Sequence, residues 1–189
     1  MIFRELELPS GDAILKGAWL LDLERHEDER GFFARTFCRD EFEAHGLDPH
    51  VSQCCLSYNR KKGTLRGMHW QAEPATESKL VRVVHGAIHD VIVDCRPGSP
   101  TFGRHAAIEL SAENRRSLYV PPLFAHGFQT LADDSEILYQ MSSEFAPEHA
   151  RGFRHDDPEV AIDWPLPVAV ISDKDRGLPS FAQATGGHG

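Results

Sequence analysis

The sequence is short of several features that define common classes of protein. It has no apolar run long enough to cross a membrane, and its acidic start lacks the basic, apolar and small-residue order of a secretory signal. Its four cysteines are not spaced as in a zinc finger: Cys38, Cys54, Cys55 and Cys95. We therefore expect a cytoplasmic protein with reduced thiols and no membrane partner.

Positive net charge is also missing, because the formal net charge is -9. Non-specific nucleic-acid binding needs a basic surface, so we expect no nucleic-acid partner. The positive side chains are unevenly placed, and a pocket for a phosphate-bearing metabolite would explain this. A solvated charged face explains it as well. The cluster comprises Arg60, Lys61, Lys62, Arg66, Lys79 and Arg82.

Helical periodicity is nearly absent, and short β-rich runs between turn residues fill the chain. We expect strands at 17–24, 31–37, 51–58, 64–71, 104–110, 117–121, 126–131 and 136–145, and a hairpin over 79–96 that turns at His85-Gly86. One short helix is expected over 40–45, with Asp40 as its N-cap. Residues 147–163 are expected to be irregular, before a crossing segment at 164–174. This pattern predicts one all-β barrel domain over residues 1–180 and a disordered tail over 181–189.

The run from Gly63 to Lys79 places a histidine and a lysine where they could act on a carbonyl. Strand alternation puts Leu65, Gly67 and His69 on one face, and Arg66, Met68 and Trp70 on the other. His69 is a candidate general base beside a fixed cation. A strand-end histidine bonded to a backbone carbonyl is the alternative.

Four ionisable groups could converge in the barrel: His69, Lys79, His126 and Tyr139. A histidine base would remove a proton next to a carbonyl, a cation would stabilise the enolate oxygen, and the phenol would return a proton to the opposite face. This chemistry needs no cofactor. Asp173 and Asp175 are both candidates to orient His69.

Alternation in 136–145 puts Tyr139 on the face of Ile137 and Met141, with Phe145 at the rim. Core packing with a satisfied hydroxyl is the alternative for Tyr139.

A metal site is the competing chemistry. Small barrels of the cupin type often bind a metal through two histidines, a glutamate and a more distant histidine, and the corresponding residues here are His69, Gln71, Glu77 and His126. Glutamine is a poor substitute for the second histidine, so we expect no metal.

Seven strings match a known family in order: DERGFF at 28–33, GTLRGMHWQ at 63–71, KLVRVV at 79–84, DVIVDCRPGSPTFG at 90–103, LSAENRRSLYVP at 110–121, AHGF at 125–128 and ISDKD at 171–175. From about Leu15 to Pro179 the sequence resembles the dTDP-4-dehydrorhamnose 3,5-epimerases, a branch of the cupins. The resemblance implies a cupin-type jelly-roll β-barrel, a cofactor-independent isomerase and a dTDP-linked 4-keto-6-deoxyhexose as substrate. It also implies a homodimer with exchanged N-terminal strands.

The resemblance assigns roles to the residues that match. His69 corresponds to the proton acceptor, Tyr139 to the proton donor and Asp175 to the partner of the histidine. Lys79 and His126 correspond to groups near the C4 carbonyl oxygen. The further substrate-binding residues would be Arg30, Arg35, Gln53, Arg66, Lys174 and Phe145, of which Phe145 would stack on the base.

The sequence departs from the family near the nucleotide and diphosphate. It has Arg35 for a glutamate, Cys54-Cys55 for Asp-Asn, Glu144 for the first of two tyrosines and Ala150 for an acid. FRHDDP at 153–158 replaces a run that carries an aromatic. We therefore expect epimerisation of the family's substrate or of a different nucleotide sugar. Inversion at C3 alone, ketoisomerisation and a non-catalytic sugar-nucleotide-binding cupin are the alternatives.

Overall fold

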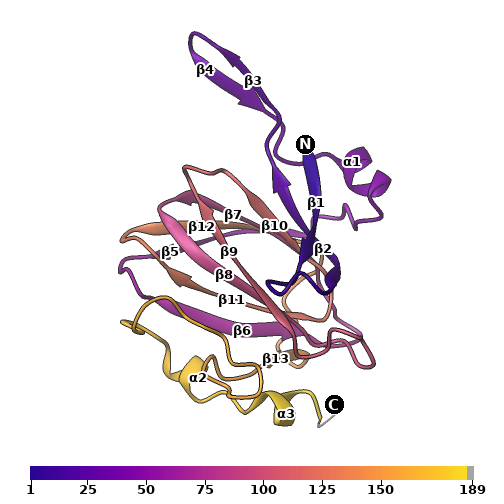
Figure 1. The fold of residues 1–189 in the computed structure, drawn as a ribbon, viewed down its shortest axis with the longest axis vertical. Coiled ribbons are helices and arrows are strands. Elements are labelled where there is room, and N and C mark those ends of the chain that lie inside the picture. The colour runs from indigo at the N-terminus through magenta and orange to yellow at the C-terminus, as the bar shows by residue number, and fades with distance from the viewer. Residues whose placement is uncertain (187–189) are drawn as a thin grey trace.

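The computed structural model describes residues 1–186, which are built mainly of short antiparallel strands (Figure 1). The strands are β1 (Ile2–Glu7), β2 (Ile14–Asp22), β3 (Arg25–Asp28), β4 (Gly31–Ala34), β5 (Gln53–Asn59), β6 (Leu65–Gln71), β7 (Lys79–His85), β8 (Ala87–Asp94), β9 (His105–Ser111), β10 (Ser117–Val120), β11 (Phe124–Thr130), β12 (Ser135–Met141) and β13 (Ala150–Gly152). The helices are α1 (Arg39–Ala44), α2 (Asp173–Arg176) and α3 (Phe181–Ala184). Within residues 1–186, no helix is long and apolar enough to cross a membrane.

Two sheets pack face to face and form the body of the molecule. One has the order β1-β2-β10-β7-β12-β5 and the other the order β13-β6-β11-β8-β9. The sheets remain open at their edges, as in a sandwich, and β5 and β13 are edge strands. The all-β, jelly-roll prediction is confirmed, with an open sandwich in place of a closed barrel.

The core lies between the sheets because alternate residues of each strand point inward. Val81 and Val83 of β7 and Ile88 and Ile92 of β8 are at most 2% exposed and belong to one cluster. Burial of each such side chain stabilises the fold by about 1.5–3 kcal/mol. The core therefore fixes the separation of the two sheets.

The predicted hairpin over 79–96 is wrong in its pairing, although its turn is correctly placed. β7 pairs with β10 and β12, while β8 pairs with β11 and β9 in the other sheet. Gly86 has a φ of +75° where the chain crosses between the sheets, and a Cβ there would collide with Ser135. In the sequence, two apolar runs joined by a glycine are compatible both with a hairpin and with a chain that crosses from one sheet to the other, which explains the wrong pairing.

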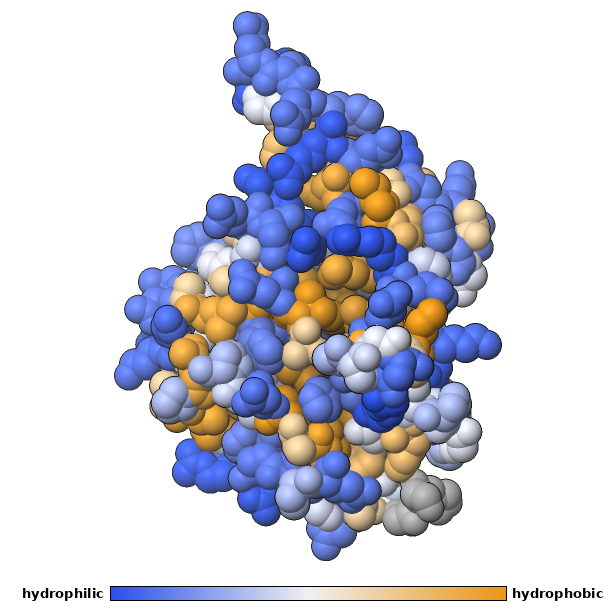
Figure 2. All heavy atoms as spheres, in the orientation of Figure 1, coloured by the Kyte–Doolittle hydropathy of each residue, from blue (hydrophilic) through white to orange (hydrophobic). Residues whose placement is uncertain are grey.

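Several short elements were not predicted. β1 precedes the first expected strand, β13 lies in the segment expected to be irregular, and β3 lies between the strands expected at 17–24 and 31–37. The N-cap of α1 is Cys38, so Asp40 lies inside the helix. The β3–β4 hairpin projects from the body at the top of Figure 1, and Figure 2 shows that this projection is mostly hydrophilic.

The C-terminal segment packs on the sandwich up to α3, which corrects the expected start of the tail at residue 181. Phe181 is 1% exposed, and its ring centroid lies 5.1 Å from that of Phe153. A capping box formed by Ser180 and Gln183 starts the helix. The remainder of the expected tail, residues 187–189, lies outside the described residues.

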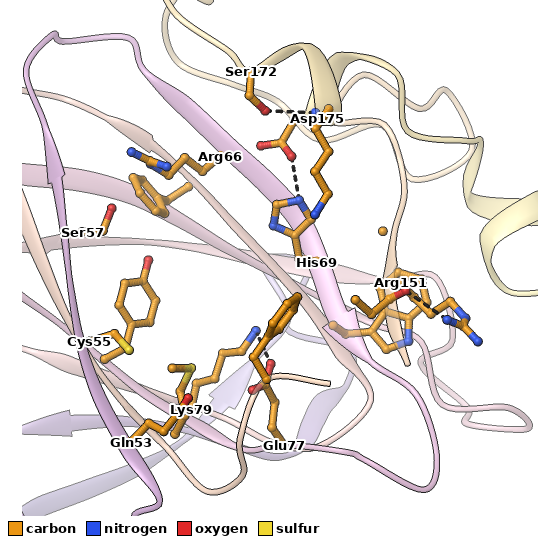
Figure 3. A pocket seen from close by; sticks show the side chains of 18 of the residues that line it. Gln53, Cys55, Ser57, Arg66, His69, Glu77, Lys79, Arg151, Ser172 and Asp175 are labelled. Carbon is orange, nitrogen blue, oxygen red and sulfur yellow. Dashed lines mark hydrogen bonds and ion pairs between the residues drawn. The ribbon is translucent and has the colours of Figure 1, made fainter. Parts of the chain in front are cut away.

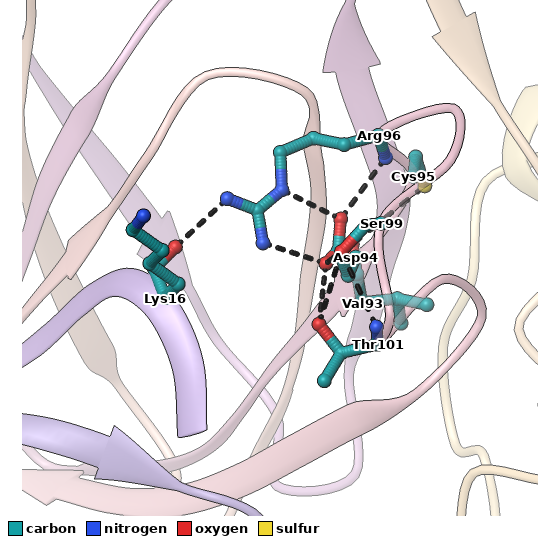
Figure 4. A network of polar contacts seen from close by, with 7 residues as sticks. All are labelled: Lys16, Val93, Asp94, Cys95, Arg96, Ser99 and Thr101. Atoms are coloured by element: carbon teal, nitrogen blue, oxygen red, sulfur yellow. Dashed lines mark hydrogen bonds and ion pairs between the residues drawn. The ribbon is translucent and has the colours of Figure 1, made fainter. Parts of the chain in front are cut away.

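A buried carboxylate fixes the loop after β8 (Figure 4). Asp94 is fully buried and accepts hydrogen bonds from the guanidinium of Arg96 and the hydroxyls of Ser99 and Thr101. Burial alone would raise the pKa of Asp94, but these bonds outweigh it and lower the pKa. Arg96 also donates to the carbonyl of Lys16, which ties the loop to β2.

Candidate active site

A pocket of about 620 Å³ opens between the two sheets, on the side of the edge strands β5 and β13 (Figure 3). Strands of both sheets contribute to the lining, and the segment after the last strand supplies one wall. The lining includes Gln53, Cys55 and Ser57 of β5, Arg66, His69 and Trp70 of β6, Glu77 and Lys79 around the start of β7, Tyr139 and Met141 of β12, Phe145, and Ser172, Lys174 and Asp175.

Arg66 and His69 both line the pocket, although strict alternation predicted opposite faces. The Cα partner of His69 on β11 is His126, and the partner of Arg66 is Phe128. β6 thus has one residue more than β11 between these two pairs, which is a β-bulge. A bulge reverses the side on which the following residues point, so it brings Arg66 to the side of His69.

Gly67 makes this bulge possible. Its φ is +122°, and a Cβ at this position would lie 2.5 Å from the Cα of Gly127. A side chain here would be strained and would also push β6 away from β11.

His69 is held by Asp175, which decides between the two candidate aspartates. His69 Nε2 lies 2.8 Å from Asp175 Oδ1, and the backbone N–H of Gly67 donates to Oδ2 at 3.3 Å. The Ser172 hydroxyl accepts from the backbone N–H of Asp175 at 3.0 Å and so caps α2. The imidazole therefore lies between Asp175 and the interior of the pocket, as Figure 3 shows.

Asp175 is 6% exposed, and its burial raises its pKa. The hydrogen bond and charge of His69, with the Gly67 N–H and Ser172, outweigh this and hold the pKa of Asp175 below its ordinary value. A charged carboxylate only accepts hydrogen bonds, so in the neutral form of His69 the proton is on Nε2 and the lone pair is on Nδ1. This tautomer is the one that a general base requires.

Tyr139 lies across the pocket on β12, and Cys55 of β5 is its Cα partner. The predicted alternation is confirmed, because Ile137 enters the core while Tyr139 and Met141 reach the pocket. Burial, followed by the negative charge of Asp90, raises the pKa of Tyr139 well above its ordinary value. The phenol therefore keeps its proton at neutral pH.

His126 is buried behind Tyr139. Its ring centroid is 5.9 Å from that of Tyr139, and His126 Nε2 lies 2.7 Å from Asp90 Oδ1. Both side chains are at most 6% exposed. Within residues 1–186, Asp90 Oδ2 has no hydrogen-bond partner. This pair forms a second, fully enclosed His-Asp contact below the wall of the pocket.

Lys79 is the first residue of β7 and lines the pocket, where it forms an ion pair with Glu77. Its Nζ lies 3.0 Å from Glu77 Oε1, and the two side chains are 11% and 10% exposed. An amine in this position is available to an oxygen atom that gains negative charge in the pocket.

The remaining expected substrate-binding groups divide into two sets. Arg66, Gln53, Lys174 and Phe145 line the pocket, and Phe145 is 61% exposed at its rim. Asn59 accepts from Arg66 Nε at 2.7 Å and fixes the direction of the guanidinium.

Arg30 and Arg35 lie elsewhere in the chain. Arg30 is in the turn of the β3–β4 hairpin, paired with Asp28, and its side chain is 84% exposed. Arg35 donates to Glu41 at 2.7 Å beside the N-terminus. The structure of the single chain does not bring these two arginines to the pocket.

The predicted cationic cluster is also divided. Arg66 and Lys79 line the pocket, whereas Arg60, Lys61 and Lys62 are exposed between β5 and β6. Arg82 donates to Ser117 and to the carbonyl of Thr36. Lys174 supplies a further positive charge at the pocket. Against these cations, the acids among the described lining residues are Glu77 and Asp175.

The metal interpretation meets a specific obstacle at Gln71. Its amide donates to the carbonyls of Ala75 and Glu144 and accepts from the N–H of Ala146. The residue is 2% exposed, so its polar atoms are occupied by the backbone of two rim loops. Within residues 1–186, no three His, Cys, Asp or Glu side chains are grouped to hold a metal ion.

Sequence reasoning did not find the supporting residues Asn59, Ser172 and Asp90, or the role of Glu77 in the pocket. Ser172 had a signal, because a serine before DKD is a typical N-cap. Asn59 contacts Arg66 and Asp90 contacts His126, in each case on a different strand, so no local sequence pattern predicts these contacts.

The chain resembles proteins of known class over most of its length. A family model described as dTDP-4-dehydrorhamnose 3,5-epimerase matches residues 12–183. The dTDP-4-dehydrorhamnose 3,5-epimerase of Sinorhizobium fredii is 43% identical over 157 residues, which cover 82% of this chain and 80% of the relative. The crystal structure of such an enzyme from Elizabethkingia anophelis has a TM-score of 0.89 at 34% identity and covers 97% of this chain and 98% of its own.

Two further solved structures contain ligands. An epimerase of Legionella pneumophila in complex with dTDP-4-keto-L-rhamnose has a TM-score of 0.85 at 34% identity, with 95% and 93% of the two chains covered. A 3'-monoepimerase from Streptomyces bikiniensis in complex with dTDP-quinovose has a TM-score of 0.82 at 34% identity, with 91% and 88% covered.

The fold and these relatives define a carbohydrate epimerase with the cupin fold, and hence an enzyme of the isomerase class. The chain belongs to the dTDP-4-dehydrorhamnose 3,5-epimerase family, as the sequence motifs predicted.

Proposed function

We propose that the protein epimerises a dTDP-linked 4-keto-6-deoxyhexose at C3 and C5 in deoxysugar biosynthesis, without a cofactor. One observation carries the proposal: the His69–Asp175 pair and Tyr139 line the same pocket. A base with a fixed tautomer and a protonated phenol are the two groups that inversion next to a carbonyl requires.

The reaction follows from the roles of these groups. His69 Nδ1 removes the proton from a carbon next to the C4 carbonyl, and electron density moves onto the carbonyl oxygen. Lys79, which lines the pocket, stabilises this oxygen, whereas His126 lies behind Tyr139 and outside the lining. Tyr139 then returns a proton to the opposite face of the same carbon, which inverts the centre. Because the carbonyl acidifies both C3 and C5, one set of groups serves both positions.

The charge of the pocket supports a nucleotide-sugar substrate. Arg66 and Lys174 supply positive charge for a diphosphate, and Gln53 adds amide donors. Phe145, at the rim, offers a ring on which a base can stack. The ligand of the related Legionella pneumophila enzyme is a dTDP-4-keto sugar, which favours thymidine as the base.

Proton NMR in deuterated water tests the proposal. The purified protein is mixed with dTDP-4-keto-6-deoxyglucose, and we expect the C3 and C5 proton signals to disappear. His69→Ala should abolish both losses. If His69→Ala exchanged these protons at the wild-type rate, His69 would not be the base.

Inversion at C3 alone is the second candidate, since a structurally similar enzyme is described as a 3'-monoepimerase. The same experiment separates the two, because a single-centre enzyme exchanges the C3 proton and retains the C5 proton.

A different nucleotide is tested by repeating the experiment with other nucleotide 4-keto sugars. Cys55 and Ala150 line the pocket where the family pattern has polar groups, and this motivates the comparison.

A non-catalytic sugar-nucleotide-binding protein is the candidate of another class. The substitutions at Cys55 and Ala150 favour it, whereas the His69–Asp175 contact opposes it, because binding alone does not need an oriented base. Saturable binding of dTDP-sugars without exchange at either carbon would support the binder.

We further propose that the protein is a homodimer, in which the β3–β4 hairpin of one copy reaches the pocket of the other. The hairpin projects from the body and carries Arg30 in its turn, with Phe33 77% exposed (Figures 1 and 2). Arg35 follows the hairpin. These arginines would then bind substrate across the dimer, which accounts for their position outside the pocket of a single chain. A monomer in light scattering at micromolar concentration would contradict this arrangement.

We expect the protein to be cytoplasmic. We also expect a single domain over residues 1–180, which α3 follows directly. All four cysteines are free thiols, which supports a reducing compartment. Fractionation of the native host checks the compartment, and a single unfolding transition in urea checks the domain.

A further inference from the structure

Glu77 is a charged group in the pocket to which the proposed reaction gives no role. Its carboxylate contacts Lys79 at 3.0 Å, and both side chains are about nine-tenths buried. Figure 3 shows this contact at the wall of the pocket opposite Asp175. The other acid of the lining, Asp175, is already committed to His69. Glu77 is therefore the acid that neutralises Lys79.

Hydrogen bonds hold the backbone on both sides of Glu77, so the position from which its side chain extends is fixed. The N–H of Ser78 donates to Ser142 Oγ at 2.8 Å, and the N–H of Ser142 donates to the carbonyl of Ser78 at 3.1 Å. Gln71 donates to the carbonyl of Ala75 at 3.0 Å on the other side. These bonds anchor the loop on both sides of residue 77.

Lys79 is equally constrained at its backbone, because it pairs with Val120 of β10 and Met141 of β12. Its long side chain nevertheless has several rotatable bonds, and an unrestrained ammonium would sample many positions. The carboxylate lies 3.0 Å from the ammonium group on one side, and an ammonium group has three N–H donors, so donors remain for a ligand.

We propose that Glu77 is a positioning residue, which holds the ammonium group of Lys79 and directs it at the oxygen that becomes negative during proton abstraction. This inference rests on the proposed function for the identity of that oxygen. The ion pair is poorly accessible to water, so removal of one partner leaves the other charge uncompensated. The effect should fall on the chemical step, because the oxygen gains its charge only in the transition state.

Four variants test the pair by kinetics: Glu77→Gln, Glu77→Asp, Lys79→Met and the double variant of Glu77→Gln with Lys79→Met. We expect Glu77→Gln to lower kcat about 10- to 100-fold with KM changed less than about threefold, and Glu77→Asp to recover part of the loss. In the Lys79→Met background, Glu77→Gln should have no further effect, since a positioning residue acts only through its partner. Glu148→Gln is the control, because Glu148 lies near the same rim with its side chain 70% exposed.

A second measurement does not depend on the substrate. Trace acetylation followed by peptide mass spectrometry reports how readily each lysine amine reacts, with exposed Lys62 as the internal reference. Loss of the ion pair releases the amine of Lys79 from its fixed position, so Lys79 should react about threefold faster, or more, in Glu77→Gln.

The outcomes separate this inference from the proposed function. If wild type exchanges no 4-keto sugar, the proposed function fails, while acetylation still decides whether Glu77 controls Lys79. Unchanged acetylation of Lys79 in Glu77→Gln overturns the inference. The inference is also overturned if Glu77→Gln lowers kcat as much in the Lys79→Met background as in wild type. An effect of Glu77→Gln on KM alone would overturn it as well.

Discussion

His69 Nε2 and Asp175 Oδ1 lie 2.8 Å apart, although 106 positions separate the two residues in the sequence. His69 belongs to a central strand of one sheet, while Asp175 belongs to a one-turn helix beyond the last strand. The orientation of the His69 imidazole therefore depends on how the C-terminal segment packs against the sandwich.

Asp175→Asn should lower kcat about 10²- to 10⁴-fold, because an amide can stabilise the wrong tautomer of His69. Asp173→Asn is the matched control, an exposed acid on the same helix. Wild-type kcat in Asp175→Asn would show that the contact is structural only.

The same pair predicts a pH dependence of stability. The pKa of Asp175 is lowered in the folded protein, so the pair stabilises the fold above the ordinary value of 3.8 and loses this contribution as the pH falls through the lowered pKa. Asp175→Asn lacks the contribution at every pH. The difference in free energy of unfolding between wild type and Asp175→Asn, measured in urea, should therefore narrow as the pH is lowered below about 4.

Tyr139→Phe should separate proton removal from inversion. His69 remains, so solvent deuterium should still enter the substrate at the face from which the proton was taken. Inverted product should fall about 10²-fold or more, since the donor at the opposite face is gone. Tyr58→Phe on β5 is the control, because the Tyr58 hydroxyl bonds to Asp134 on the surface. Equal loss of exchange and inversion would assign Tyr139 a different role.

Gly67→Ala should destabilise the fold by more than its backbone conformation alone explains. Gly67 and Gly31 have φ values of +122° and +126°, but only at Gly67 does an added Cβ meet another strand, at 2.5 Å from Gly127. We expect Gly31→Ala to cost about 1–3 kcal/mol and Gly67→Ala clearly more, measured as free energy of unfolding in urea. Equal costs would mean that β6 and β11 can separate without penalty.

Gln71→Leu should loosen the rim of the pocket. The substitution leaves three backbone groups of the two rim loops without their partner, and each buried polar group left unpaired costs about 1–3 kcal/mol. We expect a lower free energy of unfolding and a higher KM, because these loops carry Glu77 and Phe145. Gln140→Leu, at a half-exposed position of β12, provides the comparison.

The sequence contained most of the strands and the chemical groups, but little of their arrangement. Alternation correctly placed Tyr139 and Met141 on the pocket side, because β12 pairs without a register shift from Ile137 to Met141. The same rule failed for Arg66, since a one-residue bulge depends on the close approach of Gly67 to Gly127 on another strand. Periodicity describes each strand alone and cannot report such a contact.

The pairing of the strands could not be predicted from the sequence either. β7 and β8 are both apolar and consecutive, yet they lie in different sheets. The family resemblance supplied Asp175 in place of Asp173, whereas local pattern left both open. Glu77 was noticed only as a possible metal ligand, because its partner is recognised from a side-chain distance that sequence does not contain.

The order of the chain has a consequence for biosynthesis. All strands of both large sheets are complete at Gly152, whereas Asp175 is translated more than twenty residues later. A nascent chain could thus close its sandwich on the ribosome before the partner of His69 has emerged. Catalysis would then be the last property that the molecule acquires. A protease that removed the C-terminal segment would take away the partner of His69 and would also uncover the core side chains that Phe181 covers.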